Sequence, residues 1–198
     1  RGLGDVYKRQ VEAAEAELTA LDSRAGDGDL GISLARGAAA IRALPETAFA
    51  DAPETLARIG GALRRAIAGS SGPFYATALL RAARGLPPEP GLADWAAALQ
   101  RGVDAIAELG GARPGDRTML DALHPAAEAF RTELEAGQSA PVAWAAAIRA
   151  AEEGAEATVR MRPRLGRASY LGERALGVPD AGAAAAVVWL RALAMPQG

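Results

Sequence analysis

The 198-residue sequence contains no cysteine, and its single histidine is His124. Disulfide bonds are therefore excluded, as are metal sites built from thiolates or from several imidazoles. Any bound metal ion would have to be held by oxygen atoms, which favours Mg²⁺ or Ca²⁺.

Long apolar runs and an excess of charge of one sign are also missing. No apolar stretch reaches the roughly 18 residues of a membrane span, and no signal peptide is legible at the start. The formal net charge is −2 and the basic residues are scattered, so neither a nucleic acid nor a membrane surface is indicated as a partner. We expect a cytoplasmic protein.

Lysine is nearly absent. The only one is Lys8, inside a first segment, RGLGDVYKRQ, that does not begin with Met and differs from the Ala- and Arg-rich sequence after it. We interpret residues 1–10 as a non-native N-terminal scar and residues 11–198 as one domain whose natural first helix is truncated. The position of Lys8 also excludes a P-loop, whose motif requires a lysine after its second glycine.

The remaining composition is typical of helices. Ala is abundant, β-branched residues are sparse, and apolar positions recur at spacings of three and four, which leaves little from which to build strands. We predict an all-α fold, an eight-helix antiparallel up-and-down bundle or barrel. Caps and breakers place the helices near residues 11–21, 32–44, 53–68, 73–84, 92–109, 117–136, 140–161 and 181–194.

Three aspartates, Asp22, Asp27 and Asp29, lie close together between the first two predicted helices, among glycines that bend the backbone. Converging carboxylates repel one another unless a cation lies between them, so this loop is a candidate metal site. The alternative is a solvated turn with helix-capping aspartates.

Two known loop motifs fit this segment only in part. The glycines at positions 26, 28 and 31 match G-x-G-x-x-G, but helical sequence precedes them where a Rossmann fingerprint requires a strand. Counted from Asp27, positions five and twelve of an EF-hand loop would be Gly31 and Ala38, which offer no side-chain oxygen. Both motifs are therefore rejected.

Further loops offer polar groups at predicted helix ends. GSSGP at 69–73 opens a helix, where free N–H groups favour an anion, although serine and proline are also ordinary capping residues. Asp116 is a plausible N-cap of the helix that follows it, and Asp180 of the last helix. Arg164 and Arg167 suit either phosphate contact or the dipole of a helix end.

Aromatic residues are few, and we expect most of them in the core. Phe74 and Tyr75, like the three tryptophans inside predicted helices, are more typical of core packing than of stacking on a cofactor. His124 has no carboxylate partner nearby in the sequence, and we expect it to be a surface residue or a satisfied core residue.

Four ordered segments resemble the L subunit, or nucleotide-binding domain, of the dihydroxyacetone kinases. They are spread over almost the whole chain after residue 20, which makes the match more specific than any single loop. The segments are LDSRAGDGDLG (21–31), GSSGPFYATALLRAA (69–83), PGDRTMLDAL (114–123), and GRASYLGERALG with PDAGA (166–177 and 179–183).

The resemblance implies an eight-helix barrel with ADP or ATP at one end and two Mg²⁺ ions between the phosphates and Asp22, Asp27 and Asp29. Phosphoryl transfer would then rest on positioning and charge neutralisation. The nucleotide contacts implied by the resemblance are Leu30, Gly31, Ile32, Ser33, Ser70, Ser71, Gly110, Met119, Arg167, Asp180, Ala181 and Gly182.

The resemblance also implies a partner. In this family a separate K subunit or domain holds dihydroxyacetone (glycerone) covalently on a histidine, a role that we do not assign to His124. The present chain would then supply half of an active site, and we expect it to form a homodimer. The phosphoryl donor would be ATP itself or, with ADP as a bound carrier, a protein of the phosphotransferase system.

Two positions depart from the family pattern. Leu30 stands where the phosphotransferase-system type usually has histidine, and Ala181 where proline is common. The first departure favours the ATP-dependent form, in which K and L regions are often fused. The missing natural N-terminus fits either a fragment of such a fused chain or a clipped stand-alone subunit. Two alternatives stay open: the nucleotide domain of a fatty-acid kinase, and a non-catalytic interaction module that retains nucleotide.

Overall fold

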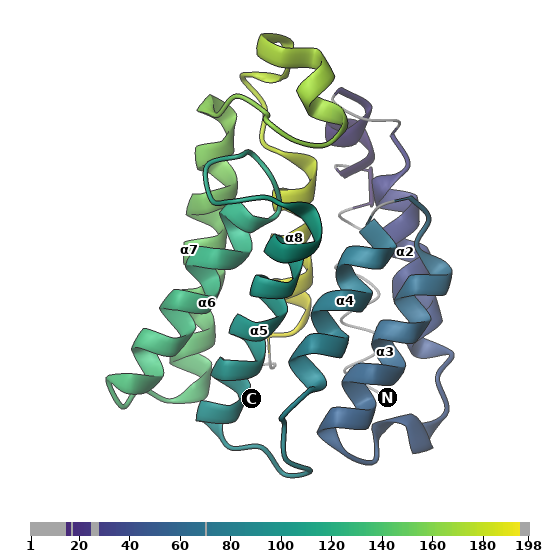
Figure 1. Ribbon diagram of the computed structural model, residues 1–198, viewed down its shortest axis with the longest axis vertical. Helices are drawn as coiled ribbons and strands as arrows, with labels where there is room; N and C mark the ends of the chain where they lie inside the picture. Colours follow the sequence, from purple (N-terminus) through teal and green to yellow (C-terminus); the bar gives the residue numbers. More distant parts are fainter. Residues whose placement is uncertain (1–14, 17, 25–27, 70, 195–198) are drawn as a thin grey trace.

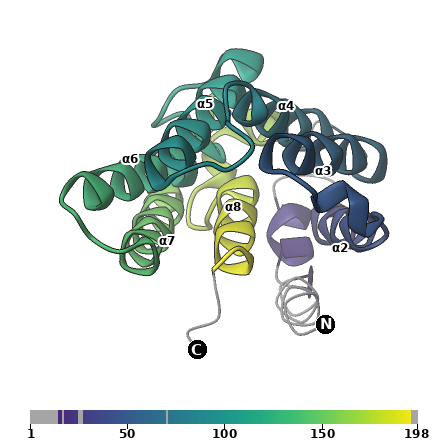
Figure 2. The same ribbon diagram turned by 90° about the horizontal axis from the view of Figure 1, so that it is seen from below.

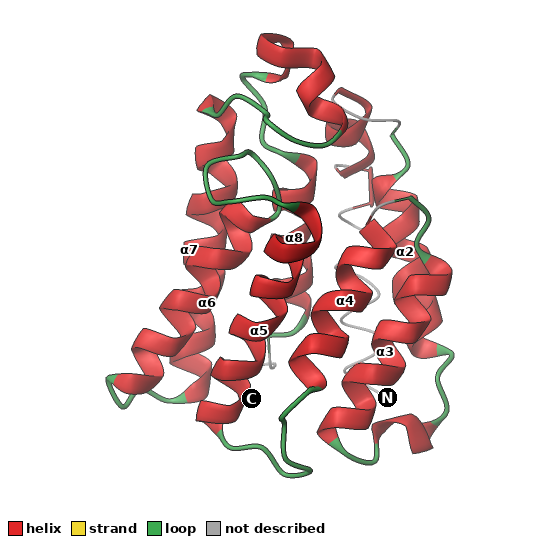
Figure 3. Ribbon diagram, in the orientation of Figure 1, coloured by secondary structure: helices red, strands yellow, loops and turns green. Residues whose placement is uncertain are grey.

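The computed structural model describes residues 15–16, 18–24, 28–69 and 71–194. The expected N-terminal scar, Asp27 and Ser70 lie outside the described residues, as do the last four positions. Throughout the described part the regular elements are helices joined by loops (Figure 3).

Each of the eight predicted helices has a counterpart. Because the alanine-rich segments bury one face and end at glycine, proline or capping residues, the pattern of the sequence placed them well. Helical residues 15–16 and 18–24 are followed by α2 (Leu30–Arg42), α3 (Ala52–Ala66), α4 (Ser71–Ala83), α5 (Leu92–Gly110), α6 (Leu120–Glu135), α7 (Ala140–Ala157) and α8 (Ala181–Ala192).

Three short 3₁₀ helices are also present. η1 (Glu46–Phe49) and η3 (Arg167–Ala175) were not predicted, whereas η2 (Thr158–Arg160) falls inside the predicted helix at 140–161. η3 is kinked at Gly172, which has a φ of 54°. Residues 162–180 lie between the last two predicted helices, so η3 falls where the sequence predicted no helix.

The helices form a barrel in which each packs against the next along the chain, from α2 to α8. Figure 2, viewed along the barrel, shows them arranged in a ring. Leu18 of the first helical segment belongs to the same buried cluster as Ala181 and Ala185 of α8, so the two ends of the ring share one core. The predicted all-α, up-and-down barrel is confirmed.

The tight contact between α6 and α7 depends on one glycine and one proline. Pro125 lies inside α6 and has no N–H to donate to the carbonyl of Asp121 one turn earlier. Gly154 of α7 packs directly on that carbonyl, and a Cβ at position 154 would overlap the oxygen of Asp121. Only glycine therefore allows this approach of the two helices.

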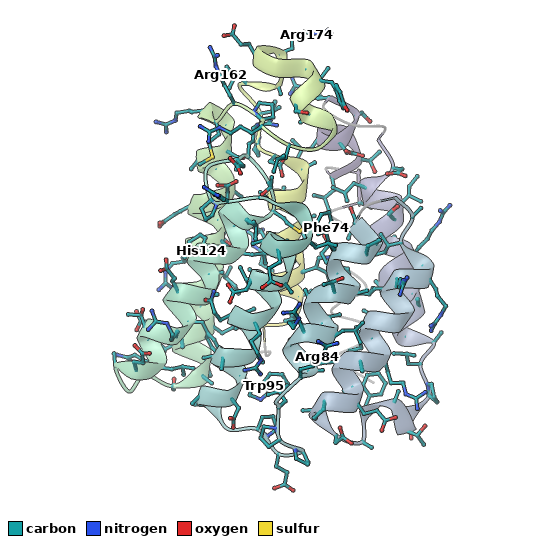
Figure 4. The ribbon with its side chains drawn as sticks, viewed as in Figure 1. Phe74, Arg84, Trp95, His124, Arg162 and Arg174 are labelled. Atoms are coloured by element: carbon teal, nitrogen blue, oxygen red, sulfur yellow. The ribbon has the colours of Figure 1, made fainter. Side chains whose placement is uncertain are left out.

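The two ends of the barrel differ. The even-numbered helices α2, α4, α6 and α8 all begin at the end drawn at the top of Figure 1, where residues 161–177, including η3, lie across the barrel. We call this segment the cap and this end the capped end. Figure 4 shows Arg162 and Arg174 in the cap and Trp95 at the opposite end.

A membrane span is not among the elements of the barrel. Over the part of the chain that the structure describes, no helix combines the length and the apolar character that crossing a bilayer requires.

Candidate functional site

A cavity of about 250 Å³ opens at the capped end. Its walls come from the first residues of four helices, from the loop before α6 and from the cap. The lining residues are Asp22, Asp29, Leu30, Ala68, Gly69, Ser71, Phe74, Ile106, Gly110, Ala112, Arg117, Thr118, Met119, Leu120, Leu165, Gly166, Ala168, Asp180, Ala181 and Gly182.

Four helix N-termini meet at this cavity. Leu30, Ser71, Leu120 and Ala181 are the first residues of α2, α4, α6 and α8, and all four line it. The first turn of a helix carries N–H groups without an intrahelical partner, and the helix dipole places partial positive charge there. A cavity surrounded by such ends suits an anion with several charged groups, such as a polyphosphate.

Two aspartates of the acidic loop lie in the cavity wall. Asp22 Oδ2 accepts hydrogen bonds from the backbone N–H groups of Asp29, at 3.1 Å, and Leu30, at 3.3 Å. Asp22 therefore caps α2 from the preceding helix, which is the capping role weighed as an alternative. The same carboxylates of Asp22 and Asp29 offer the hard oxygen atoms that Mg²⁺ takes as ligands.

The third aspartate, Asp27, lies outside the described residues. Among the residues that are described, no group of three acidic, histidine or cysteine side chains is close enough to hold a metal ion. A metal site at this loop therefore stays a prediction that rests on Asp22 and Asp29 for its described ligands.

The predicted nucleotide contacts divide into three groups. Those that line the cavity are Leu30, Ser71, Gly110, Met119, Asp180, Ala181 and Gly182. Ser70 and the side chain of Arg167 lie outside the described residues. The remaining three are Gly31, Ile32 and Ser33.

Gly31, Ile32 and Ser33 are not among the residues that line the cavity. A Cβ at Gly31 would overlap the carbonyl oxygen of Glu15, so this glycine allows α2 to pack against the first helical segment. Ile32 is 43% exposed, whereas Ser33 is buried. Both residues turn away from the cavity because α2 directs successive side chains to different sides.

One side of the cavity is apolar. Phe74, Ile106, Met119 and Leu120 lie there, and a Cβ on Gly110 would be 3.1 Å from Cε1 of Phe74. Phe74 was predicted to be a core residue. It does pack against the cluster around Ile106 and Leu120, but it also forms part of the cavity wall and points toward the barrel interior near the capped end (Figure 4).

Two aspartates, Asp116 and Asp121, hold the loop before α6 in place, and the sequence pattern predicted the wrong role for Asp116. α6 begins at Leu120, so Asp116 is not its N-cap as predicted. Asp116 instead accepts a hydrogen bond from the N–H of Arg113 at 2.8 Å. Asp121, which lies inside the helix, accepts from the N–H groups of Gly115 and Thr118 and so closes the loop onto the helix start.

Arg117 is the main residue of the site that the sequence pattern missed. Its side chain is fully buried, and its φ of 62° lies in the left-handed region. Nη2 donates to the carbonyls of Ala175, at 2.7 Å, and Val178, at 3.0 Å, and Nε to that of Thr158, at 3.3 Å. These partners are far away in the sequence, so no local signal marked this arginine.

Asp180 caps α8, as predicted, by accepting a hydrogen bond from the N–H of Ala183 at 2.9 Å. Its own N–H donates to Oγ1 of Thr158 at 2.8 Å. Burial raises the pKa of the Asp180 carboxyl to about 6, and the Ala183 N–H and the nearby Arg117 guanidinium offset only part of that rise. Among the described carboxylates that line this cavity, Asp180 is therefore the one whose pKa is clearly raised.

A second cavity, of about 540 Å³, lies toward the other end of the barrel. Its lining includes Leu56, Trp95, Phe130, Trp144 and Leu193, and no charged residue is among the described residues that line it. Such a surface offers nothing to neutralise phosphate, so the capped end is the candidate site for an anionic ligand.

His124 is not part of either cavity. Its side chain is 38% exposed and Nδ1 lies 3.6 Å from Oε2 of Glu128. The expectation of a surface residue holds, but the statement that no carboxylate lies nearby in the sequence was wrong, because Glu128 follows one helical turn later.

The comparisons with known proteins agree with the fold. The family model described as the DAK2 domain matches residues 24–195, which is most of the chain, and the chain belongs to this family. The chain is 36% identical to the ADP-binding subunit DhaL of the PEP-dependent dihydroxyacetone kinase of Escherichia coli (strain K12), over 97% of the chain and 91% of that subunit.

Longer relatives contain the same domain. The chain is 40% identical to triokinase/FMN cyclase of Mus musculus over 90% of its own length, but it spans only 31% of that enzyme. The crystal structure of the dihydroxyacetone kinase from C. freundii in complex with AMP-PNP and Mg²⁺ superposes with a TM-score of 0.72 at 30% identity, over 98% of this chain and 33% of that one. The resemblance found in the sequence is confirmed.

Proposed function

We propose that this chain is the nucleotide-binding subunit or domain of a kinase for dihydroxyacetone or a similar short keto-sugar. It would bind ADP or ATP with Mg²⁺ in the cavity at the capped end, in the cytoplasm. The observation that carries the proposal is the meeting of four helix N-termini around one cavity whose wall also contains Asp22 and Asp29.

The cavity has two sides that match the two parts of a nucleotide. The helix starts at Ser71 and Ala181 would donate N–H groups to the phosphates, and the apolar surface near Phe74 and Gly110 would accept the base. Relatives support the assignment by their names: one is an ADP-binding subunit, and one solved neighbour contains AMP-PNP and Mg²⁺.

Asp22 and Asp29 would hold the metal, together with Asp27 by the family resemblance, and we propose two Mg²⁺ ions. The bound metal would neutralise phosphate charge as it builds up during transfer. The chain's own contribution would be position: Asp22 is fixed by the N–H groups of Asp29 and Leu30, so its carboxylate is oriented before any ligand arrives.

The acceptor would be held by a partner. Among the described residues that line the cavity there is no lysine or histidine that could capture a ketone covalently. We therefore propose that a K subunit or domain carries the keto-sugar. Because Leu30 replaces the histidine usual in the phosphotransferase-system type, ATP is the favoured donor, with a phosphotransferase-system protein as the other possibility, and homodimer formation is part of the same proposal.

The test has two stages. Calorimetric titration of ADP and ATP into the nucleotide-stripped chain should give binding with Mg²⁺ and none with excess EDTA. Addition of a K partner, dihydroxyacetone and ATP should then give dihydroxyacetone phosphate. Binding without turnover would favour a non-catalytic module that retains nucleotide, whereas no binding by a folded sample would contradict the proposal altogether.

A further inference from the structure

The cap is held at both of its ends by the loop from Arg113 to Asp121. At the start of the cap, the N–H of Arg164 donates to the carbonyl of Asp116 at 3.2 Å, and Nη1 of Arg164 lies 3.3 Å from Oδ1 of Asp116. At its end, Nη2 of Arg117 donates to the carbonyls of Ala175 and Val178. The exposed Arg164 contributes a weak pair, whereas the buried Arg117 makes charge-assisted bonds.

Arg117 adopts an unfavourable conformation to make these bonds. A left-handed φ costs a non-glycine residue about 1 kcal/mol or more, and a buried guanidinium must be well satisfied to repay its desolvation. Yet Nη1 of Arg117 is buried without a hydrogen-bond partner, 3.9 Å from Oδ2 of Asp180. Strain and an unsatisfied donor at a cavity wall point to a role beyond stability.

We propose that Arg117 is a positioning residue that fastens the cap and the start of α8 over bound nucleotide. The inference rests on the proposed function, because it concerns how the same cavity retains its ligand. Leu165, Gly166 and Ala168 of the cap line the cavity, as do Asp180 to Gly182 at the start of α8. Arg117 bonds to the main chain between these two walls, so its loss would let both walls move.

The role predicts a kinetic signature. A cap that detaches more easily opens one wall of the cavity, so nucleotide should leave faster while its association is little changed. Because a planar guanidinium reaches three carbonyls from different segments, lysine, which offers a single point charge, should not substitute for it.

The variants Arg117→Met and Arg117→Lys test this in stopped-flow measurements with fluorescent ADP and Mg²⁺. Both should release nucleotide at least about tenfold faster than the wild type, equivalent to about 1.4 kcal/mol, with association changed less than about twofold. The control is Arg162→Met, which removes a cap arginine that pairs with the exposed Glu173 and should leave the release rate unchanged.

The failures of the two proposals are distinguishable. Absence of ADP binding in the wild type would overturn the proposed function and this inference with it. An unchanged release rate in Arg117→Met, or full restoration by Arg117→Lys, would overturn the positioning role alone, while nucleotide binding itself stands.

A measurement on the wild type covers the case in which Arg117→Met does not fold. The N–H groups of Leu176 and Gly177 donate to the carbonyls of Glu173 and Val159 at the end of the cap, and neither residue lines the cavity. Saturating ADP with Mg²⁺ should slow hydrogen exchange of these amides at least about fivefold, since occupancy would be transmitted through Arg117 and the cap. Unchanged exchange there would overturn the inference.

Discussion

The two ends of this barrel are built from the same helices but offer different chemistry. At the capped end, helix starts, aspartates and a buried arginine surround the smaller cavity. Toward the opposite end, the described lining of a larger cavity consists mainly of tryptophans, leucines and alanines and includes no charged group. Since an up-and-down barrel places alternate helix starts at each end, the dipoles alone do not distinguish the ends. The cavity linings do, because Asp22, Arg117 and Asp180 line only the cavity at the capped end among the residues that the structure describes.

The largest expected effect comes from removing a carboxylate at the capped end. Asp22→Asn should weaken Mg²⁺-dependent ADP binding by about 3 kcal/mol, because the site loses a metal ligand and a negative charge while the amide oxygen can still cap α2. Competition titration measures the dissociation constant. The matched control is Asp51→Asn, which changes the carboxylate that caps α3 by accepting from the N–H of Glu54; equal losses in both variants would contradict the assignment of the site.

The next effect concerns stability rather than binding. Gly154→Ala should lower the free energy of unfolding by about 2 to 3 kcal/mol, because its Cβ would overlap the carbonyl oxygen of Asp121 and force α6 and α7 apart. Urea unfolding provides the value. Gly61→Ala, in a helix interior where the nearest foreign atom is 3.4 Å away on the flexible Arg65, should instead stabilise the protein by up to about 1 kcal/mol.

Asp180 should make part of the stability depend on pH. Its pKa is about 6 in the folded chain and about 3.9 when unfolded, so between these values the folded state holds a proton that the unfolded state has released. This group therefore stabilises the fold less as pH rises from 4 to 7. Asp180→Asn cannot ionise, so the free energy of unfolding of the variant relative to the wild type should increase by about 2 kcal/mol over that range.

Unfolding of the nucleotide-free proteins at pH 4, 5, 6 and 7 provides this difference, in which the other titrating groups cancel. A constant difference across the range would mean that burial does not raise the pKa of Asp180. The test also compares the two ends, because the described residues that line the larger cavity include no titratable group.

The smallest effect should come from the apolar end. Trp144→Phe removes the hydrogen bond from Nε1 to the carbonyl of Leu190, at 3.1 Å, and should lower the free energy of unfolding by about 1 kcal/mol. ADP affinity should not change, since Trp144 is remote from the capped end. A loss of affinity comparable with that of Asp22→Asn would show that the two ends are not independent.

Much of this molecule could be predicted from local sequence patterns. Helix periodicity and capping residues located the eight helices. The role of Asp180 as the N-cap of α8 followed from its position before a run of alanines. The acidic loop was recognised because its aspartates are close in the sequence. Such features depend on residues within a turn or two of one another, which is the range over which sequence patterns carry information.

Features that depend on distant contacts were missed. Arg117 reaches carbonyls 41, 58 and 61 positions away, and its left-handed backbone is unusual for arginine. Asp116 precedes α6 and Asp121 lies in its first turn. Only the folded loop shows that Asp121, and not Asp116, accepts hydrogen bonds from the N–H groups of Gly115 and Thr118. Gly31 was assigned to the nucleotide, yet its described role is close packing against Glu15.

The most direct test of the central claim, that nucleotide binds at the capped end, is an NMR titration of the labelled chain with ADP and Mg²⁺. The backbone amides of Leu30, Ser71, Met119 and Ala181 should shift most, because they lie at the helix starts around the cavity. Shifts concentrated around Trp95 and Leu193 at the apolar end, or no shifts at saturating ligand, would contradict it.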